Sequence, residues 1–441
     1  LSILLSLLVP VPANRSPDCG GILTPSGLSY CKSGPCISCT VSREGRQSAL
    51  LTLPFCSSRN QINSVTVAEL SLSLIPDAGL RLSIDADLSI SPIPSTTTVM
   101  RLSILADLHV EMNPEGNLEL VTSACKPTLE EVQSTEEMAR SAPRLSFKSS
   151  DSDLDKEISI DKICLEVSKL LLLPNERLIS LTAQFPVTPS CQVQYLPLAA
   201  PMFSEQGVTI SLQTTFQVAG MAIPLPVSPM PFSMPEPATS SPSHLILAFS
   251  EHFYTSLFFA LEISGAFNMT LLVKLTPLPR QMGSLFQEDA PVVLQAVFRS
   301  SPRVVLEEGK AALRLFLTVQ VGTGSPAFQS FLSINVDMTA GLLLSVADTR
   351  MMISAAGIED LELSLAASNV GPVPAALLEE LFLPTIREEV PAQMNVVLSE
   401  GVFLPHVFSF TYTDVNVTIH RVRNKTFKSL PARFDLKGTW S

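Results

Sequence analysis

Apolar and polar residues alternate one by one along several long segments of the chain, as they do in β-strands that bury one face. The clearest segments are residues 80–90, 102–112 and 313–321. Each runs for about ten residues, which is longer than the usual strand of about five or six residues. Long strands of this kind twist strongly, so we predict sheets that wrap around a helix rather than a compact sandwich.

A different pattern occupies residues 361–420. Leu361, Leu363 and Leu365 mark one face of a strand that ends at a turn over residues 369–372. Apolar residues then recur at helical spacing and predict an amphipathic helix over residues 374–398. The residues of this apolar stripe are Leu377, Leu378, Leu381, Phe382, Ile386, Val390 and Met394. Because prolines 384 and 391 fall inside the pattern, we expect a kinked or segmented helix.

The apolar stripe has two interpretations. It is ordinary core, which the residues by themselves favour, or it is the wall of an elongated apolar cavity between helix and sheet. A cavity of that kind suits an acyl chain better than a reaction, because the burial of methylene groups is itself favourable.

The chain divides into two halves with a similar order of elements. A second helix is predicted over residues 160–173, with Pro174 ending it. Residues 223–240 are rich in proline and are predicted to form a stiff linker. The flanking domains, 14–222 and 241–420, each show strands, a long helix and a final strand. This order indicates an α+β protein with two copies of one architecture.

Composition limits the class of protein. Apolar residues make up 46% of the chain and charged residues only 16%. Prolines and polar residues interrupt every long uncharged window, so no transmembrane segment is predicted. The surplus apolar surface must therefore be buried internally, in two-sided sheets or in a lined cavity.

Several features are typical of a secreted protein. Residues 1–13 resemble the end of a signal peptide, although a buried strand would have a similar composition. The sequons make Asn14, Asn268, Asn416 and Asn424 glycosylation candidates. All eight cysteines lie in the first half and are disulfide candidates. Cys31, Cys36 and Cys39 suggest a metal knuckle, but no further ligand follows at a zinc-like spacing, so no metal site is predicted.

The charge of the chain argues against one class of partner. The formal net charge is −12, which disfavours nucleic acid. The segment 421–441 is basic against this background. It is either a solvated flexible tail or a docking site for anionic polymers and lipid headgroups.

Catalytic motifs were not found in the sequence. There is no His-Glu-x-x-His helix motif and no Gly-x-Ser-x-Gly elbow. Asp151, Asp153 and Asp155 have the spacing of a calcium loop, but Lys156 and Lys162 stand where glycine and glutamate are needed. We therefore predict that the chain is not an enzyme and requires no cofactor.

Several motifs together resemble a known family. They are the segment 20–30, the strands over 80–90 and 102–112, the pair Cys125 and Cys164, the segment 194–201, and the turn and helix after Ser368. In this order, with a proline linker between the halves, they resemble the superfamily of bactericidal/permeability-increasing protein, lipopolysaccharide-binding protein and PLUNC. Because it has two domains, the chain resembles the long branch of this superfamily, which includes the egg-white ovoglobulin type.

The resemblance implies an elongated boomerang in which each domain is a twisted antiparallel sheet around a long helix, with a central sheet between them. It implies a disulfide between Cys125 and Cys164, and leaves open the pairing of Cys19, Cys31, Cys36, Cys39, Cys56 and Cys191. It also turns the apolar stripe of residues 377–394 into a candidate lipid pocket. The implied ligand is a phospholipid or another hydrophobic small molecule, including a bacterial surface lipid, and the implied role is secreted host defence. The alternative is a structural or surface-active extracellular protein with no obligatory ligand.

Two features depart from the family pattern. The resemblance places an opening strand over residues 20–30 and a long helix after it, but residues 31–60 show no helical period. The N-terminal half is also acidic, whereas the bactericidal relative carries a basic tip there. Electrostatic attraction to the phosphates of lipid A is therefore not predicted.

Overall fold

The structure is a computed structural model. It describes residues 16–33, 60–92, 98–131, 164–165, 168–169, 172–224, 232–234, 243–273, 292–323, 328–405, 412–420 and 433–440. The predicted signal segment 1–13, Asn14, Asn424 and most of the segment 31–60 lie outside these residues.

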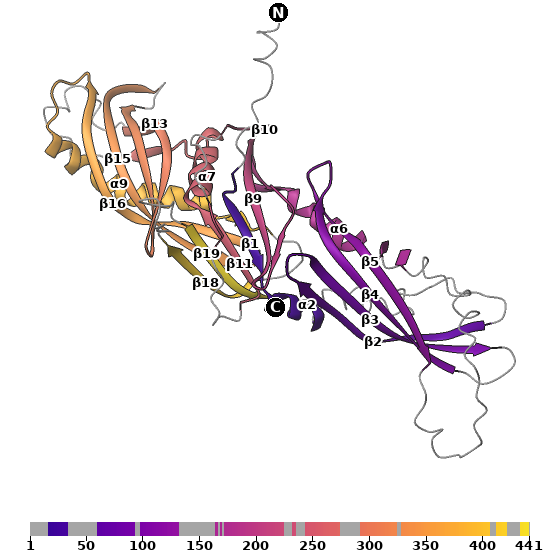
Figure 1. The fold of residues 1–441 in the computed structure, drawn as a ribbon. Helices are drawn as coiled ribbons and strands as arrows, with labels where there is room; N and C mark the ends of the chain where they lie inside the picture. The colour runs from indigo at the N-terminus through magenta and orange to yellow at the C-terminus, as the bar shows by residue number, and fades with distance from the viewer. Residues whose placement is uncertain are drawn as a thin grey trace, which may run out of the picture.

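Three antiparallel sheets follow one another along an elongated molecule (Figure 1). A four-stranded sheet lies at one end, a six-stranded sheet at the other, and a nine-stranded sheet between them. We call the part built on the four-stranded sheet the N-lobe and the part built on the six-stranded sheet the C-lobe. The predicted α+β architecture, with two twisted lobes joined by a central sheet, is confirmed.

The N-lobe sheet has the strand order β2-β3-β4-β5. Its strands are β2 (Asn60–Ile75), β3 (Gly79–Pro92), β4 (Thr98–Met112) and β5 (Leu118–Glu131). The alternation predicted for β3 and β4 is confirmed: Leu82 and Ile84 are buried on one face, and Arg81 is exposed on the other.

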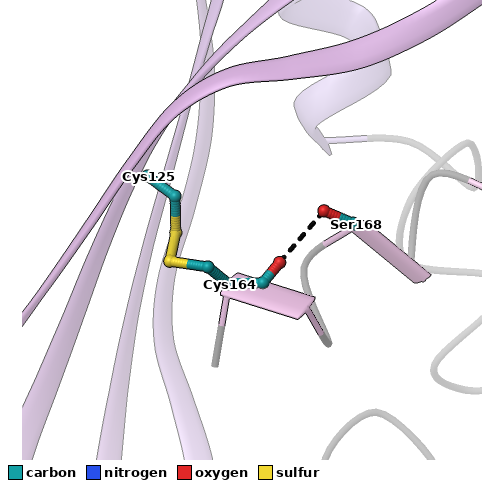
Figure 2. The surroundings of a disulfide bond; sticks show 3 residues. All are labelled: Cys125, Cys164 and Ser168. Carbon is teal, nitrogen blue, oxygen red and sulfur yellow. Dashed lines mark hydrogen bonds between the residues drawn. A yellow bond between two sulfur atoms is a disulfide. The ribbon is translucent and has the colours of Figure 1, made fainter. Parts of the chain in front are cut away.

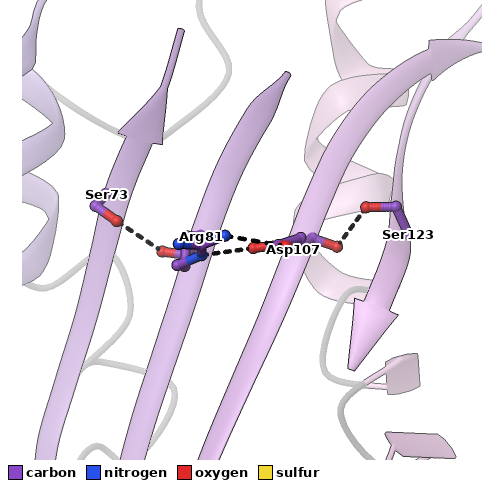
Figure 3. A network of polar contacts seen from close by, with 4 residues as sticks. All are labelled: Ser73, Arg81, Asp107 and Ser123. Carbon is purple, nitrogen blue, oxygen red and sulfur yellow. Dashed lines mark hydrogen bonds and ion pairs between the residues drawn. The ribbon is translucent and has the colours of Figure 1, made fainter. Parts of the chain in front are cut away.

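Polar contacts link the strands across the outer face of the N-lobe sheet (Figure 3). Arg81 donates hydrogen bonds to both carboxylate oxygens of Asp107, at 2.7 and 3.2 Å. Ser73 donates to the carbonyl oxygen of Arg81, and Ser123 donates to that of Asp107. Exposed ion pairs add little stability, about 0–1 kcal/mol each, so these contacts mark the solvent face rather than hold the lobe together.

The C-lobe sheet has the strand order β12-β13-β14-β15-β16-β17. Its strands are β12 (Thr270–Val273), β13 (Val292–Glu307), β14 (Lys310–Thr323), β15 (Gln329–Ala347), β16 (Arg350–Ser368) and β17 (Val402–Phe403). β16 pairs with β15 along its whole length but with β17 only at Arg350 and Met351. The rest of the outer edge of β16 therefore lacks a neighbouring strand among the described residues.

The central sheet is built around an antiparallel pair from the two halves of the chain. β1 (Cys19–Leu23) pairs with β11 (Leu245–Ser250), and a helix follows each of them. The order is β18-β19-β11-β1-β9-β7-β6, with β8 and β10 also paired to β9. The remaining strands are β6 (Gln184–Thr188), β7 (Cys191–Pro197), β8 (Met202–Ser204), β9 (Gly207–Val218), β10 (Met221–Ala222), β18 (Tyr412–His420) and β19 (Arg433–Trp440). A strand followed by a helix thus occurs in both halves of the chain, and the two strands pair at the middle of the molecule.

The interpretation of residues 421–441 as a solvated flexible tail is wrong for its last part. Residues 433–440 form β19, which lies between β11 and β18 in the central sheet. Phe434, Leu436 and Trp440 alternate with polar residues there, a period-2 pattern that the basic charge of the segment had masked.

Two helix predictions need correction. Helix α2 (Pro25–Ser33) begins inside the segment expected to be an opening strand, so the strand is confined to Cys19–Leu23. Helix α6 (Leu172–Ile179) includes Pro174 in its first turn, so Pro174 does not end a helix there. Proline fits the first turn because the backbone N–H of that turn needs no intrahelical acceptor. A short 3₁₀ helix, Ser180–Thr182, follows.

Helix α7 (Glu251–Ile263) was not predicted and forms the centre of the core. Its N-cap Ser250 accepts a hydrogen bond from the backbone N–H of Phe253 at 3.2 Å. Phe253, Tyr254 and Leu257 are fully buried. His252, Thr255 and Ser256 are buried as well, so this helix lies inside the core instead of presenting its polar residues to solvent.

Glu262, near the end of α7, is a partly buried acidic residue beside this core. One of its carboxylate oxygens is buried without a hydrogen-bond partner among the described residues, and burial raises its pKa. Folding therefore favours the protonated form of Glu262. The charged form lowers the stability of the folded protein as the pH rises from the usual pKa of 4.5 through the raised pKa. We expect Glu262→Gln to raise Tm at pH 7 and to leave it unchanged well below pH 4.5. An equal gain at both pH values would contradict this.

Candidate functional site

Helix α9 (Ala375–Leu398) is the long helix predicted from the apolar stripe. It begins directly after Pro374 and continues without a break through Pro384 and Pro391. Of the two expected forms, the segmented helix is therefore wrong, and a kink at the prolines stays a prediction. Its buried residues are Leu378, Phe382, Ile386, Val390, Pro391, Met394 and Leu398. Their spacing of four places them along one face, and that face is turned toward the sheet.

The opposite wall is the inner face of the C-lobe sheet. It consists of Leu294 from β13, Leu317 and Val319 from β14, and Val336 and Met338 from β15. These residues face the same side because the strands are in register and alternate residues point the same way. Three residues after α7 complete the wall at one side: Phe267, Met269 and Leu271.

Two apolar gaps remain between the helix and the sheet. The first has a volume of about 20 Å³ and reaches Ile386 and Val390; the second, of about 10 Å³, reaches Met394. Both are lined by Met269, Ala296 and Leu317, so they adjoin each other. Among the residues that the structure describes, no titratable side chain lines either gap. The chemistry of this lining suits an apolar group.

The predicted pocket residues divide into three groups. Ile386, Val390 and Met394 line the gaps. Leu378 and Phe382 are buried, 0% and 2% exposed, and line neither gap. Leu377 and Leu381 are only partly buried against the core. The part of the stripe beside the gaps is thus Ile386, Val390 and Met394, and the lipid pocket along the whole stripe stays a prediction.

Sequence reasoning missed one polar residue beside this site. Asn395 uses its side chain to hold both backbone groups of Ala355 in β16: the Ala355 N–H donates to Oδ1 at 2.7 Å, and Nδ2 donates to the Ala355 carbonyl at 3.2 Å. We call this arrangement an Asn clip. The available signal was an asparagine inside an apolar helix, where its propensity is low.

The N-lobe contains the same Asn clip. Leu120 N–H of β5 donates to Oδ1 of Asn175 at 2.8 Å, and Nδ2 of Asn175 donates to the Leu120 carbonyl at 3.1 Å. Asn175 lies on α6, the helix that follows β5, just as α9 follows β16. The two lobes therefore share a polar contact as well as an order of elements.

The cysteine pair implied by the family resemblance is bonded in the structure. Cys125 of β5 and Cys164 are joined by a disulfide with a Cα–Cα distance of 5.9 Å (Figure 2). The Ser168 hydroxyl donates to the Cys164 carbonyl at 3.0 Å, as one helical turn would place it. Cys19 and Cys191 are buried free thiols, and burial raises the pKa of Cys191 to about 11. The side chains of Cys31, Cys36, Cys39 and Cys56 lie outside the described residues.

The other candidate residues do not line the gaps. Asn268 follows α7 and Asn416 lies in β18, and both are exposed as a glycan would require. Their glycosylation stays a prediction. Within the described ranges, no group of His, Cys, Asp or Glu could hold a metal ion. In the same part of the chain, no helix is long and apolar enough to span a membrane.

Comparison with known proteins identifies the family. Residues 188–425 match the model of the C-terminal domain of the LBP / BPI / CETP family, and residues 58–137 match the model of its N-terminal domain. Protein TENP of Gallus gallus is 58% identical, with 100% of both chains covered. BPI fold-containing family B member 2 of Homo sapiens is 25% identical, with 95% of this chain and 96% of that protein covered.

A solved structure agrees at the level of the fold. The crystal structure of lipopolysaccharide binding protein superposes with a TM-score of 0.52 and 16% identity, covering 97% of this chain and 99% of that chain. The resemblance inferred from the motifs is confirmed, and the chain belongs to the LBP / BPI / CETP family.

Proposed function

We propose that this protein binds the apolar chain of a phospholipid or another acyl lipid between α9 and the C-lobe sheet. The observation that supports the proposal is the pair of adjoining gaps whose lining is entirely apolar. Close-packed interiors normally leave few such voids, and these two lie side by side along one helix face.

The chemistry of the lining fits a hydrocarbon chain. Each buried methylene group contributes about 0.8 kcal/mol, so a chain of about sixteen carbons gains roughly 10 kcal/mol before ordering costs. Met269, Met338 and Met394 stand in the lining, and methionine side chains adapt easily to a new neighbour. No polar lining group recognises a headgroup, so the headgroup stays outside the gaps.

The proposed setting is extracellular, with a role in host defence. Supporting features are the exposed sequons at Asn268 and Asn416 and the disulfide between Cys125 and Cys164. A bacterial surface lipid belongs to the same ligand class because it carries acyl chains. Since the chain has a net charge of −12, recognition would rest on its acyl chains rather than on attraction to its phosphates.

The size of the gaps favours a second candidate function. Small-molecule pockets usually measure about 300–1,000 Å³, whereas these gaps measure about 20 and 10 Å³. A structural or surface-active extracellular protein with no obligatory ligand would have a C-lobe that is closed in this way. Lipid binding requires that the walls separate.

One experiment decides between these functions. The protein is purified from a secreting cell without detergent, its lipids are extracted for mass spectrometry, and uptake of a fluorescent fatty acid is titrated. We expect a co-purifying lipid and saturable uptake. If neither is found, lipid binding is rejected and the structural role remains.

A further inference from the structure

If the C-lobe binds a lipid, as proposed above, one wall of the site must move to admit it. The inference about which wall moves rests on that proposed function. The gaps of about 20 and 10 Å³ have room for about one or two water molecules, so no acyl chain fits without displacement of a wall. The candidates are the sheet and helix α9.

The sheet is the stiffer wall. β14 pairs with β15 from Ala311 to Thr323, and β15 pairs with β16 from Leu332 to Ala347. Separating any of these strands would break a ladder of backbone hydrogen bonds, each of which would then need a new partner. Displacing the middle of helix α9 would break no such ladder.

Helix α9 is weakened on both sides of the larger gap. Pro384 and Pro391 lack a backbone N–H, so the carbonyl groups of Glu380 and Arg387 lose their intrahelical partners. Ile386 and Val390, the helix residues that line the larger gap, lie between these prolines. Proline is the commonest site at which a helix bends.

The C-terminal end of α9 is held firmly. The Asn clip joins Asn395 to Ala355 through two hydrogen bonds. Leu398 is buried, and beyond it Val402 pairs with Met351 of β16. Arg350 also donates to the carbonyl oxygen of Glu400 at 2.5 Å.

The Asn clip is placed where a strand would otherwise be. Ala355 lies on the part of β16 that β17 does not reach, and Leu120 lies in β5, the last strand of the N-lobe sheet. In each lobe the asparagine satisfies both backbone groups of one edge residue, which a neighbouring strand would normally do. It fixes the helix to the sheet at one point beside the gaps.

We propose that the part of α9 between Pro384 and Pro391 is the movable wall of the lipid site, and that Asn395 is the positioning residue about which it opens. The bend at the prolines moves Ile386 and Val390 away from the sheet and joins the two gaps into one channel. The Asn clip keeps Met394 and the last turns of α9 in place during this movement.

The first test measures the rate of uptake of a fluorescent fatty acid by stopped flow. In the full chain with Pro384→Ala and Pro391→Ala, two helix hydrogen bonds are restored, and we expect uptake about tenfold slower. Affinity should also fall, by a similar factor, because the bound state keeps the wall displaced and loses the restored hydrogen bonds. Pro372→Ala, an exposed proline ahead of the helix, is the matched control and should not change the rate.

The second test concerns the positioning residue. Asn395→Ala removes the clip, so we expect faster uptake and faster release of the fatty acid. Asn175→Ala removes the equivalent clip in the N-lobe and controls for the general loss of two hydrogen bonds. Hydrogen exchange of residues 385–390 should be faster than that of 394–398 in the wild type, and the difference should shrink with bound fatty acid or with both prolines replaced.

The outcomes separate this inference from the proposed function. A wild-type protein that takes up no fatty acid rejects the lipid site itself. Normal uptake whose rate and affinity are both unchanged by the proline substitutions rejects only the movable wall. An Asn395→Ala protein with wild-type rates of uptake and release overturns the role of the clip.

Discussion

Replacing Cys125 and Cys164 together with alanine should lower the free energy of unfolding of the N-lobe by about 4 kcal/mol. The disulfide closes a loop with a sequence separation of 39 residues, and removing such a constraint restores about 13 cal/mol/K of entropy to the unfolded chain. Native-state hydrogen exchange of β4 and β5 measures the loss where it occurs. The C-lobe strands β14 and β15 serve as the internal control and should exchange as in the wild type.

A double-mutant cycle separates the covalent bond from the contacts of the two side chains. Neither thiol can form the bond alone, so each single substitution should already cost nearly as much as the double substitution. If the losses of stability from the two single substitutions sum to that of the double substitution, the contacts of Cys125 with the N-lobe core carry the stability instead.

The long strands could be predicted because their signal is local and strong. In β3, β4 and β14, apolar and polar residues alternate over the whole strand. They do so because one face of the sheet is buried and the other faces solvent. The first and last residues of the strands were harder to predict. β15 and β16 each have 19 residues, and bulges between them shift the alternation of apolar and polar positions.

Elements at the centre of the molecule were the hardest to predict. Helix α7 has few polar residues, and His252, Thr255 and Ser256 are themselves buried, so it does not resemble a surface helix; only its start at Ser250 and Glu251 carried a capping signal. β19 was hidden for the opposite reason, because its charged residues resembled a solvated tail. Both elements have neighbours far along the chain: α7 packs mainly against β13 and β9, and β19 pairs with β11.

The candidate site was predicted in part. The apolar stripe identified α9 and its buried face, but the pattern does not distinguish a residue against solid core, such as Phe382, from one beside a gap, such as Val390. That difference depends on the side chains opposite, among them Ala296, whose small size leaves the space open. The Asn clip depends on a contact over 40 residues of sequence and has no local signature beyond an unfavourable residue in a helix.

Replacing Ala296 with valine should weaken fatty-acid binding while it stabilises the protein. Ala296 lines both gaps, so the added methyl groups occupy the place where the two gaps adjoin. If a ligand loses the burial of two methylene groups, about 1.6 kcal/mol, its affinity falls about fifteenfold. Filling a void with a β-branched residue in a strand should at the same time raise the free energy of unfolding by about 0.5–1 kcal/mol.

The neighbouring residue supplies the control for this variant. Val297 lies on the same strand but is 55% exposed on the other face, so Val297→Leu adds volume outside the gaps and should change neither quantity. Titration of a fluorescent fatty acid and thermal unfolding measure the two effects on the same samples. Opposite signs for Ala296→Val are expected only if the gap is the place where ligand binds, because a void that is merely a defect gains stability when filled and has no affinity to lose. Unchanged affinity with increased stability would move the ligand elsewhere in the fold.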